Sequence, residues 1–190
     1  MAAFLLLLLV PSVGLGRQGP APLSYRQLVQ PLNAVALLEL DARPDSAFGV
    51  FYSGWDRSGA TPQGSVAIHH PNLDEKAISL NDDPLTTGES CIGISGQETH
   101  WYVDNWEEGT TEPGSSGAGL WDPNTKQRVG CLSGGIASCM TRDFDCYGKF
   151  AVAWDLGMSA SQGLRDWLDP DALGVLSVEG ADLVTDCPFS

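Results

Sequence analysis

Two adjacent serines, Ser115 and Ser116, lie between Gly114 and Gly117 in the segment TEPGSSGAGL (111–120). A serine nucleophile needs an exposed Oγ, a neighbouring base, and backbone N–H groups directed at the oxyanion of the tetrahedral intermediate. Glycines two residues before and one residue after Ser116 let the backbone fold so that the amides of Gly114 and Ser116 converge. Glycine–serine turns are also common on protein surfaces. The segment alone therefore leaves two interpretations open, a catalytic loop and a flexible turn.

A second chemical feature is a pair of acids, Asp143 and Asp145, on either side of Phe144 and just before the run YGKFAVAW (147–154). An acid at the bottom of a narrow pocket can pair with a Lys or Arg side chain of a substrate and so determine specificity. The alternative is that Asp145 is one more exposed loop acid in an acidic protein.

The charge of the chain limits its partners. Ten Lys plus Arg residues oppose 24 Asp plus Glu residues, which gives a formal net charge of −14. This charge opposes binding to nucleic acid or to anionic lipid, and it is compatible with a cationic substrate or peptide.

These residues need elements to position them, and the sequence predicts strands. Short apolar or alternating runs between turn residues recur at 36–40, 48–55, 65–70, 100–106, 117–122, 128–135 and 147–154. Such runs are typical of an all-β antiparallel sandwich or barrel. In the segment 159–168, Leu164, Trp167 and Leu168 have helical spacing, so we expect one short helix near the C-terminus.

The ends of the chain differ from this pattern. The apolar run 4–10 has the length of a signal-peptide h-region and is too short to span a bilayer. No Lys or Arg precedes it and no clean cleavage site follows, so an export signal and an untargeted apolar tail both stay open. We expect an unstructured lead-in up to residue 33, one domain over 34–175, and a tail over 176–190.

Six segments resemble those of bacterial lysyl endopeptidases in order and spacing. They are GWDRSG (54–59), AIHHPNLDEKAIS (67–79), TEPGSSGAGL (111–120), LSGG (132–135), DCYGKF (145–150) and RDWLDP (165–170). That family consists of secreted trypsin-like serine proteases that cleave after lysine. The resemblance covers residues 36–173 and implies the C-terminal six-stranded antiparallel barrel of the chymotrypsin-like two-barrel fold, with a short C-terminal helix and the first barrel largely missing.

The resemblance also implies roles for residues. By position, Ser116 matches the nucleophile, and the amides of Gly114 and Ser116 match the oxyanion hole. Asp145 matches the acid of the lysine pocket, and Trp55 matches a tryptophan that narrows the substrate cleft.

The segment Leu132 to Gly135 matches the strand that pairs with the peptide substrate, so Ser133, Gly134 and Gly135 are predicted to bind substrate. Some family members carry at the position of Ser133 a histidine that stacks with the cleft tryptophan. The subsite details of this chain are therefore expected to differ.

The acid–base pair of the family has no counterpart in this sequence. The family histidine lies in an A-H-H-C segment of the first barrel, and residues 1–33 contain no histidine. The family aspartate precedes the strand that ends LLEL, where this chain has Asn33 and Ala34. His69 and His70 fall in a different family segment, so structural hydrogen bonds are expected for them. We therefore predict a nucleophile and a pocket without a base, and little peptidase activity for this chain alone.

The five cysteines, Cys91, Cys131, Cys139, Cys146 and Cys187, form no C-x-x-C pair, so disulfides are the default if the protein is exported. The resemblance implies that the partner of Cys139 lies near the mature N-terminus of the family proteins. The pairing of the other four stays open. A secreted or periplasmic location follows from the resemblance.

We expect no cofactor, no metal, no nucleic acid and no membrane span, and a lysine-containing protein or peptide as substrate. The first alternative is a non-catalytic secreted pseudoprotease that binds lysine-containing peptides. A carbohydrate binder is suggested by the cluster Trp101, Tyr102, Trp106, Glu107 and Glu108. A metal site is possible by ligand type at His69, His70, Asp74, Glu75 and His100, although their spacing matches no ligand pattern.

Overall fold

The structure is a computed structural model that describes residues 4–5, 25–27, 37–40, 51–89, 91, 98–156 and 163–182. Several predictions concern residues outside these ranges. They include most of the apolar start and of the lead-in, the positions of Asn33 and Ala34, Cys187, and the last part of the tail.

The main element is a sheet of nine strands, and its longest path runs in the order β7-β6-β10-β11-β12-β9-β8. All neighbours along this path are antiparallel. The strands are β6 (Ser65–His69), β7 (Ala77–Asn81), β8 (Thr86–Gly88), β9 (His100–Val103), β10 (Gly119–Trp121), β11 (Arg128–Gly135) and β12 (Asp145–Lys149). Two short strands, β5 (Trp55–Asp56) and β13 (Ser177–Val178), join the sheet beside β11. The prediction of an all-β protein is confirmed.

The prediction of a closed barrel is wrong, because the sheet is open. The path ends at β7 on one side and at β8 on the other, and these two strands do not pair. The free edge of β7 instead meets the loop after β9 through the single bridge Leu80↔Glu108. The alternating runs predict strands, but they contain no information on whether the first and last strands meet.

Alternation along the strands produces the first core. In β6, Ser65, Ala67 and His69 are buried while Ile68 on the opposite face is exposed, which is the two-residue period of a half-buried strand. The central strands β11 and β12 are buried along almost their whole length. Their apolar residues form the first cluster with Ala67, Leu85, Trp101, Val103, Trp106, Leu120, Val129, Leu132, Ala137 and Tyr147.

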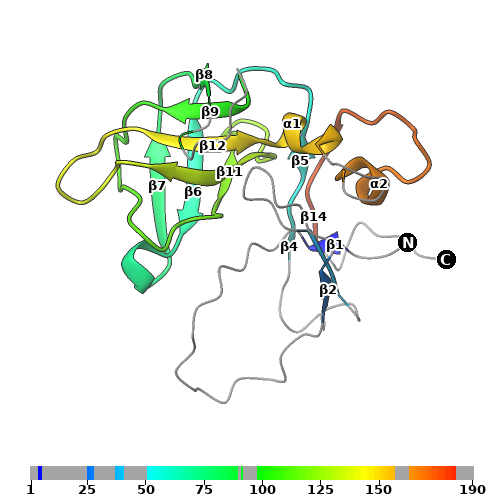
Figure 1. The fold of residues 1–190 in the computed structure, drawn as a ribbon, viewed down its shortest axis with the longest axis horizontal. Coiled ribbons are helices and arrows are strands. Elements are labelled where there is room, and N and C mark those ends of the chain that lie inside the picture. Colours follow the sequence, from blue (N-terminus) through cyan, green and yellow to red (C-terminus); the bar gives the residue numbers. More distant parts are fainter. Residues whose placement is uncertain are drawn as a thin grey trace, which may run out of the picture.

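A second core lies at the end of the sheet, where β12 runs directly into the helix α1 (Phe150–Asp155) (Figure 1). The run 147–154 was predicted as a strand, and this prediction is wrong after Lys149. Phe150, Ala153 and Trp154 are the buried residues of α1, at the spacing i, i+3, i+4 of a helix. A short apolar run also fits a strand, so the sequence pattern could not distinguish the two.

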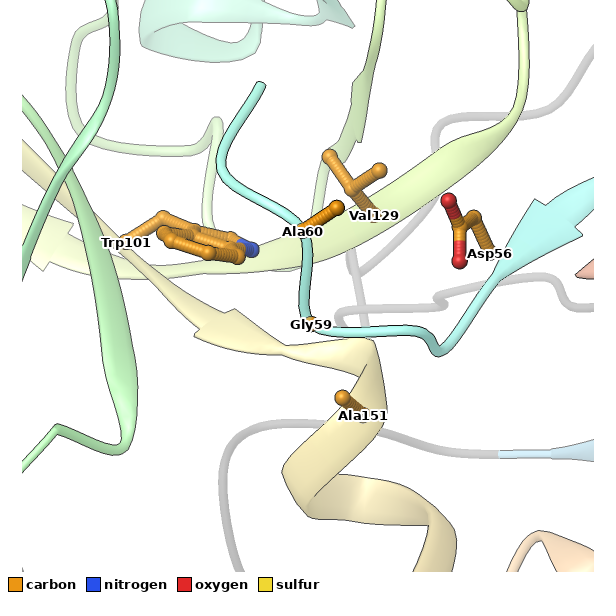
Figure 2. Close-up of a pocket in the computed structure, with 6 residues that line it drawn as sticks. All are labelled: Asp56, Gly59, Ala60, Trp101, Val129 and Ala151. Atoms are coloured by element: carbon orange, nitrogen blue, oxygen red, sulfur yellow. The ribbon is translucent and has the colours of Figure 1, made fainter. Parts of the chain in front are cut away.

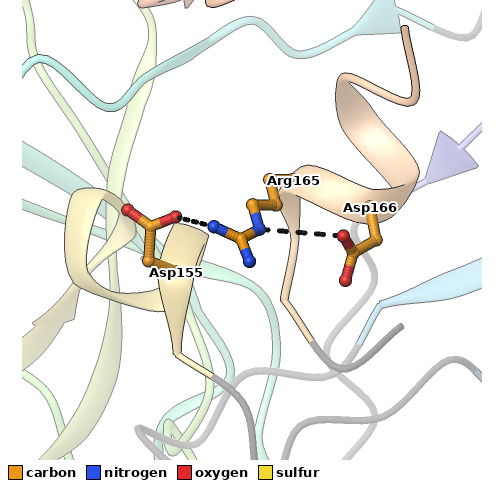
Figure 3. Close-up of polar contacts among 3 residues, drawn as sticks. All are labelled: Asp155, Arg165 and Asp166. Atoms are coloured by element: carbon orange, nitrogen blue, oxygen red, sulfur yellow. Dashed lines mark hydrogen bonds and ion pairs between the residues drawn. The ribbon is translucent and has the colours of Figure 1, made fainter. Parts of the chain in front are cut away.

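The predicted C-terminal helix is present as α2 (Arg165–Leu168), next to α1 in Figure 1. Arg165 joins the two helices through an ion pair of 3.0 Å with Asp155, and its Nε lies 3.7 Å from Asp166 (Figure 3). Both partners of the first pair are more than half exposed, so its contribution to stability is at most about 1 kcal/mol. Leu164 of this segment is buried in the second cluster, and packing rather than the ion pair therefore holds α2.

Smaller elements complete the described chain. The strands β1 (Phe4–Leu5) and β2 (Tyr25–Gln27), within the predicted lead-in, pair with β3 (Leu38–Leu40). The strand β4 (Phe51–Tyr52) pairs with β14 (Ala181–Asp182), and the 3-10 turn η2 (Pro71–Leu73) connects β6 to β7. Among the helices of the described segments, none has the length and apolar character that crossing a membrane requires.

Candidate functional site

The segment 112–118 consists of two consecutive turns. Ser115 N–H donates to the carbonyl of Glu112 (3.0 Å), and Ala118 N–H donates to the carbonyl of Ser115 (3.0 Å). The third residue of each turn is a glycine with positive φ, +103° at Gly114 and +87° at Gly117. A glycine at this position is what a type II turn requires. The glycine frame therefore has a conformational reason, and it places Ser116 at the exposed corner of the second turn.

The amides of this double turn fall into two groups. The N–H groups of Ser115, Gly117 and Ala118 all donate to backbone carbonyls of the protein. In the part of the chain that the structure describes, the N–H groups of Gly114 and Ser116 donate no hydrogen bond. These two amides are the ones that an oxyanion hole at Ser116 would use.

Ser115 attaches the loop to the sheet through hydrogen bonds of its side chain. Its side chain is 2% exposed, and its Oγ lies 2.9 Å from Nδ1 of His69 while accepting a hydrogen bond from Glu112 N–H. His69 Nε2 lies 2.9 Å from Oγ of Ser79 on β7. Burial, followed by the charge of His70, lowers the pKa of His69, so the imidazole is neutral at neutral pH. A buried hydroxyl–imidazole–hydroxyl chain thus connects the loop to the sheet.

Ser116 has no histidine beside it among the described residues. His69 is bonded to Ser115 and Ser79, and His100 to Thr99 and Ser133. The remaining histidine, His70, is bonded through Nδ1 to the carbonyl of Asp74 (3.0 Å). The interpretation of the histidines as structural agrees with these contacts. The one Ser–His hydrogen bond in the loop belongs to Ser115, whose buried Oγ a substrate carbonyl cannot reach.

Asp145 is buried at the start of β12 with 2% of its surface exposed. Its Oδ2 accepts hydrogen bonds from Nε1 of Trp106 and from Oγ1 of Thr111, both at 2.7 Å. Burial raises the pKa of this carboxyl, and the hydrogen bonds from Thr111 and Trp106 act in the opposite direction. The alternative that Asp145 is an ordinary exposed loop acid is therefore wrong.

The strand β11 lies between the serine loop and this acid. Gly117 N–H donates to the carbonyl of Leu132, and Leu132 N–H donates to the carbonyl of Ala118. Three residues further along, where the strand ends, Gly135 pairs with Asp145, and a Cβ added to Gly135 would lie 2.0 Å from Oδ1 of Asp145. The structure thus brings the loop of Ser116, the strand 132–135 and Asp145 together.

Ser133 takes a different position from the one expected. The register of β11 with β12 shifts between Leu132 and Gly134, so Ser133 is the additional residue of a β-bulge. Its side chain is 8% exposed, and its Oγ lies 3.0 Å from Nε2 of His100. Burial and the nearby charge of Lys149 lower the pKa of His100. Ser133 therefore contacts a neutral imidazole inside the sheet.

Trp55 packs in the second core cluster. Its ring stacks on Phe150 at a centroid distance of 5.6 Å and lies 4.8 Å from the ring of Trp154. The guanidinium of Arg57 lies over the ring of Trp154, 4.4 Å from its centre. The contacts of Trp55 are with α1, and those of Ser133 are with β9. A role for Trp55 in a substrate cleft stays a prediction.

The structure settles one cysteine pair. Cys91 and Cys146 form a disulfide, with Cα atoms 6.3 Å apart. Cys131 is buried and Cys139 is exposed, and neither is in a disulfide within the described part of the chain. Backbone N–H of Cys139 donates to Oε1 of Glu112 (2.6 Å), so the segment around Cys139 adjoins the serine loop.

The two other site hypotheses find little support in the side-chain positions. Trp101 is 3% exposed and Trp106 is fully buried, so neither ring offers a face to a sugar. One face of Trp101 is occupied by Nζ of Lys149, 3.9 Å from the ring centre. Within the described ranges, His, Cys, Asp and Glu side chains form no group of three or more that could hold a metal ion.

A small cavity lies apart from Asp145, between β5, β9, β11 and α1 (Figure 2). It is lined by Asp56, Gly59, Ala60, Trp101, Val129 and Ala151, and its volume is about 10 Å³. This space holds roughly one water molecule and cannot hold a lysine side chain.

Sequence reasoning missed the residues that support the site. Thr111 and Trp106 hold Asp145, and His69 holds Ser115, yet none of them was assigned a role at the site. The signal for Thr111 was its place five residues before Ser116 in the same segment. The partners of Trp106 and His69 gave no signal, because they lie 39 and 46 residues away in the sequence.

A serine on a two-glycine loop, bonded to a strand that ends at a buried acid, is compatible with a domain related to serine peptidases. The comparison with protein families is consistent with this class. The family described as lysyl endopeptidase, C-terminal domain, matches residues 24–148, which is more than half of the chain and includes both Ser116 and Asp145. The protein belongs to this family.

Proposed function

We propose that this protein is a lysine-directed serine endopeptidase domain, in which Ser116 is the nucleophile and Asp145 binds the lysine side chain of the substrate. The observation that supports it most is the arrangement around β11. The loop with the open amides of Gly114 and Ser116 is bonded to Leu132, and the buried acid pairs with Gly135, three residues further along the strand. A peptide paired with Ser133, Gly134 and Gly135 would present its lysine to Asp145 and its carbonyl to Ser116.

The hydrolytic step needs a base that takes the proton from Ser116 Oγ while the oxygen attacks the substrate carbonyl. The N–H groups of Gly114 and Ser116 would then stabilise the negative charge on the carbonyl oxygen. Since the described histidines are all bonded elsewhere, we propose that the residues described here bind substrate but do not cleave it. Cleavage would require a histidine and an aspartate from a first barrel, as in the two-barrel proteases.

A second candidate is a pseudoprotease that binds lysine-containing peptides without hydrolysis. It is favoured by the hydrogen bonds that already engage His69, His70 and His100, together with the two hydrogen bonds that hold Asp145. The two candidates share the pocket and differ only in whether Ser116 ever reacts.

The disulfide Cys91–Cys146 is typical of proteins outside the cytoplasm. Together with the family, it supports an extracellular protein. We propose that the protein is secreted or periplasmic and that its partners are proteins or peptides with an accessible lysine.

Binding and turnover test this proposal separately. Binding of Nα-acetyl-lysine amide is measured by calorimetry for the wild-type protein, Asp145→Asn, and the control Asp143→Asn, which neutralises an exposed neighbouring acid. We expect binding by the wild type and the control, and a loss of about 30-fold or more for Asp145→Asn, because a desolvated ion pair is lost. Equal affinity in all three proteins would refute the pocket.

Turnover is measured with a fluorogenic lysyl substrate, alone and with a separately produced first barrel of a lysyl endopeptidase. We expect no turnover alone and turnover that Ser116→Ala abolishes when the first barrel is added. Turnover by the protein alone would contradict the proposed need for an external base. Binding without turnover under both conditions would favour the pseudoprotease.

A further inference from the structure

The carboxylate of Asp145 is held asymmetrically. Both of its hydrogen bonds, from the indole of Trp106 and the hydroxyl of Thr111, go to Oδ2 at 2.7 Å. The donors are themselves rigid, because Trp106 is fully buried and Thr111 is 3% exposed. A carboxylate oxygen has two lone pairs, so these two donors saturate Oδ2.

The other oxygen is left for a ligand. Within the described part of the chain, Oδ1 receives no hydrogen bond. It faces the backbone of Gly135, where any side chain would collide, since an added Cβ would lie 2.0 Å from Oδ1. The absence of a side chain at Gly135 therefore leaves Oδ1 next to the backbone of the strand that we propose to bind substrate.

The inference rests on the proposed function of Asp145. We propose that Thr111 and Trp106 are positioning residues that determine specificity, because they occupy Oδ2 and present Oδ1 alone to the cation of the substrate. An ammonium group is a compact charge and needs only one carboxylate oxygen. A guanidinium binds a carboxylate best through two parallel N–H···O bonds, which need both oxygens. Saturation of Oδ2 thus disfavours arginine without any steric barrier.

Thr111 has a second consequence for the site. It belongs to the same loop as Ser116, and its hydroxyl connects this loop directly to the acid. The distance between Ser116 and the proposed cation site is therefore restrained by a hydrogen bond between the loop and the start of β12.

Variants of Thr111 and of its neighbour Thr110 that differ by one hydroxyl or methyl group test this inference. Thr111→Val removes the hydroxyl and keeps the shape, Thr111→Ser keeps the hydroxyl, and Thr110→Val removes the hydroxyl of the neighbouring threonine, which bonds only to a backbone carbonyl. Trp106→Phe removes the other donor and replaces Thr111→Val if that variant does not fold.

The first measurement is the pKa of Asp145 by NMR titration of its carboxyl carbon, which needs no ligand. We expect Thr111→Val to raise this pKa, because the hydrogen bond favours the ionised form, and Thr111→Ser and Thr110→Val to leave it near the wild-type value. A purely structural role of Thr111 would not move this pKa. An unchanged pKa in Thr111→Val would overturn the inference.

The second measurement compares Nα-acetyl-lysine amide with Nα-acetyl-arginine amide. We expect Thr111→Val to weaken lysine binding by about threefold to tenfold and to narrow the preference for lysine over arginine, while Thr111→Ser restores both. A raised pKa with an unchanged preference would overturn the role in specificity. If the wild type binds neither ligand and Thr111→Val still raises the pKa, the proposed pocket fails and the anchoring of Asp145 stands.

Discussion

The two residues that we propose for the site, Asp145 and Ser116, lie on segments that are each bonded to β11, and yet their surroundings differ. Asp145 is buried, and two short hydrogen bonds fix its orientation. Ser116 is exposed at the corner of a turn, and in the described structure its hydroxyl has no hydrogen-bond partner. The described residues hold Asp145 in place, as the proposed recognition of lysine needs. The catalytic half depends on groups that these residues do not provide.

This difference follows from what each group needs. A buried carboxylate is costly unless donors surround it, so the pocket acid must be built into the core of the sheet. A nucleophile must instead be accessible and must meet its base at a surface. The comparison therefore predicts that substitutions around Asp145 change stability, whereas the substitution of Ser116 does not.

The largest effect is expected for Trp106→Ala. Trp106 is fully buried in the first core cluster, and it donates to Asp145. Loss of a buried aromatic side chain costs about 3–5 kcal/mol, measured as the free energy of unfolding in urea. Trp106→Phe keeps most of the volume and should lose less. Substitutions at exposed sites usually change the free energy of unfolding by less than about 1 kcal/mol. A change as small as this for Trp106→Ala would contradict the buried position of the ring.

The adjacent serines give a matched pair. Ser115→Ala should lower the free energy of unfolding by about 1–3 kcal/mol, because it leaves Nδ1 of His69 and the N–H of Glu112 without a partner. Ser116→Ala should stay within about 0.5 kcal/mol of the wild type, as surface substitutions do. Urea unfolding measures the free energy of unfolding of both variants, and we expect the larger loss for Ser115→Ala. Equal losses would mean that Ser116 is held by contacts of its own.

Replacement of the acid should stabilise the protein. Burial raises the pKa of Asp145, so the folded state binds more protons than the unfolded chain above the ordinary pKa of about 3.9. Stability is then lost as the pH rises through the folded pKa, and an uncharged Asn avoids this loss. We expect Asp145→Asn to be more stable than the wild type at pH 7, and to gain less at pH 4.

Chemical denaturation at the two pH values, with Asp143→Asn as the control, measures this gain. Asp143 is exposed, so Asp143→Asn controls for the loss of one acidic charge from the protein. If Asp145→Asn lost stability between pH 4 and pH 7 relative to the wild type, the cost of burying the charge would be smaller than the benefit of its two hydrogen bonds.

The sequence predicted the parts of this protein that depend on local patterns. Alternating runs located β6, β9, β10 and β11, and the glycines around Ser116 correspond to the two positive φ angles of the loop. The prediction was wrong where one pattern fits both a helix and a strand. An example is the run 147–154, whose second part forms the helix α1. Pairings between distant residues carried no local signal. The disulfide Cys91–Cys146, the bonds of Trp106 and His69, and the open ends of the sheet all belong to this second kind.

The smallest expected effect concerns the two buried histidines that support the loop and the strand. Burial is the main cause that lowers the pKa of His69 and of His100, so near pH 6 each imidazole binds fewer protons in the folded state than in the unfolded chain. The free energy of unfolding should therefore fall as the pH drops below the ordinary histidine pKa of about 6.5. The slope is at most about 1.4 kcal/mol per pH unit for each histidine.

Unfolding at pH 7.5 and pH 5, both above the ordinary carboxyl range, measures this slope for the wild type, His69→Gln and His70→Gln. The charge of His70 is the smaller of the two causes that lower the pKa of His69, so His70→Gln should keep most of the wild-type slope. His69→Gln should reduce the slope, because glutamine does not ionise. Equal slopes in all three proteins would mean that the proton on His69 costs the fold nothing. The chain from Ser115 to Ser79 would then tolerate an imidazolium that donates from both nitrogens.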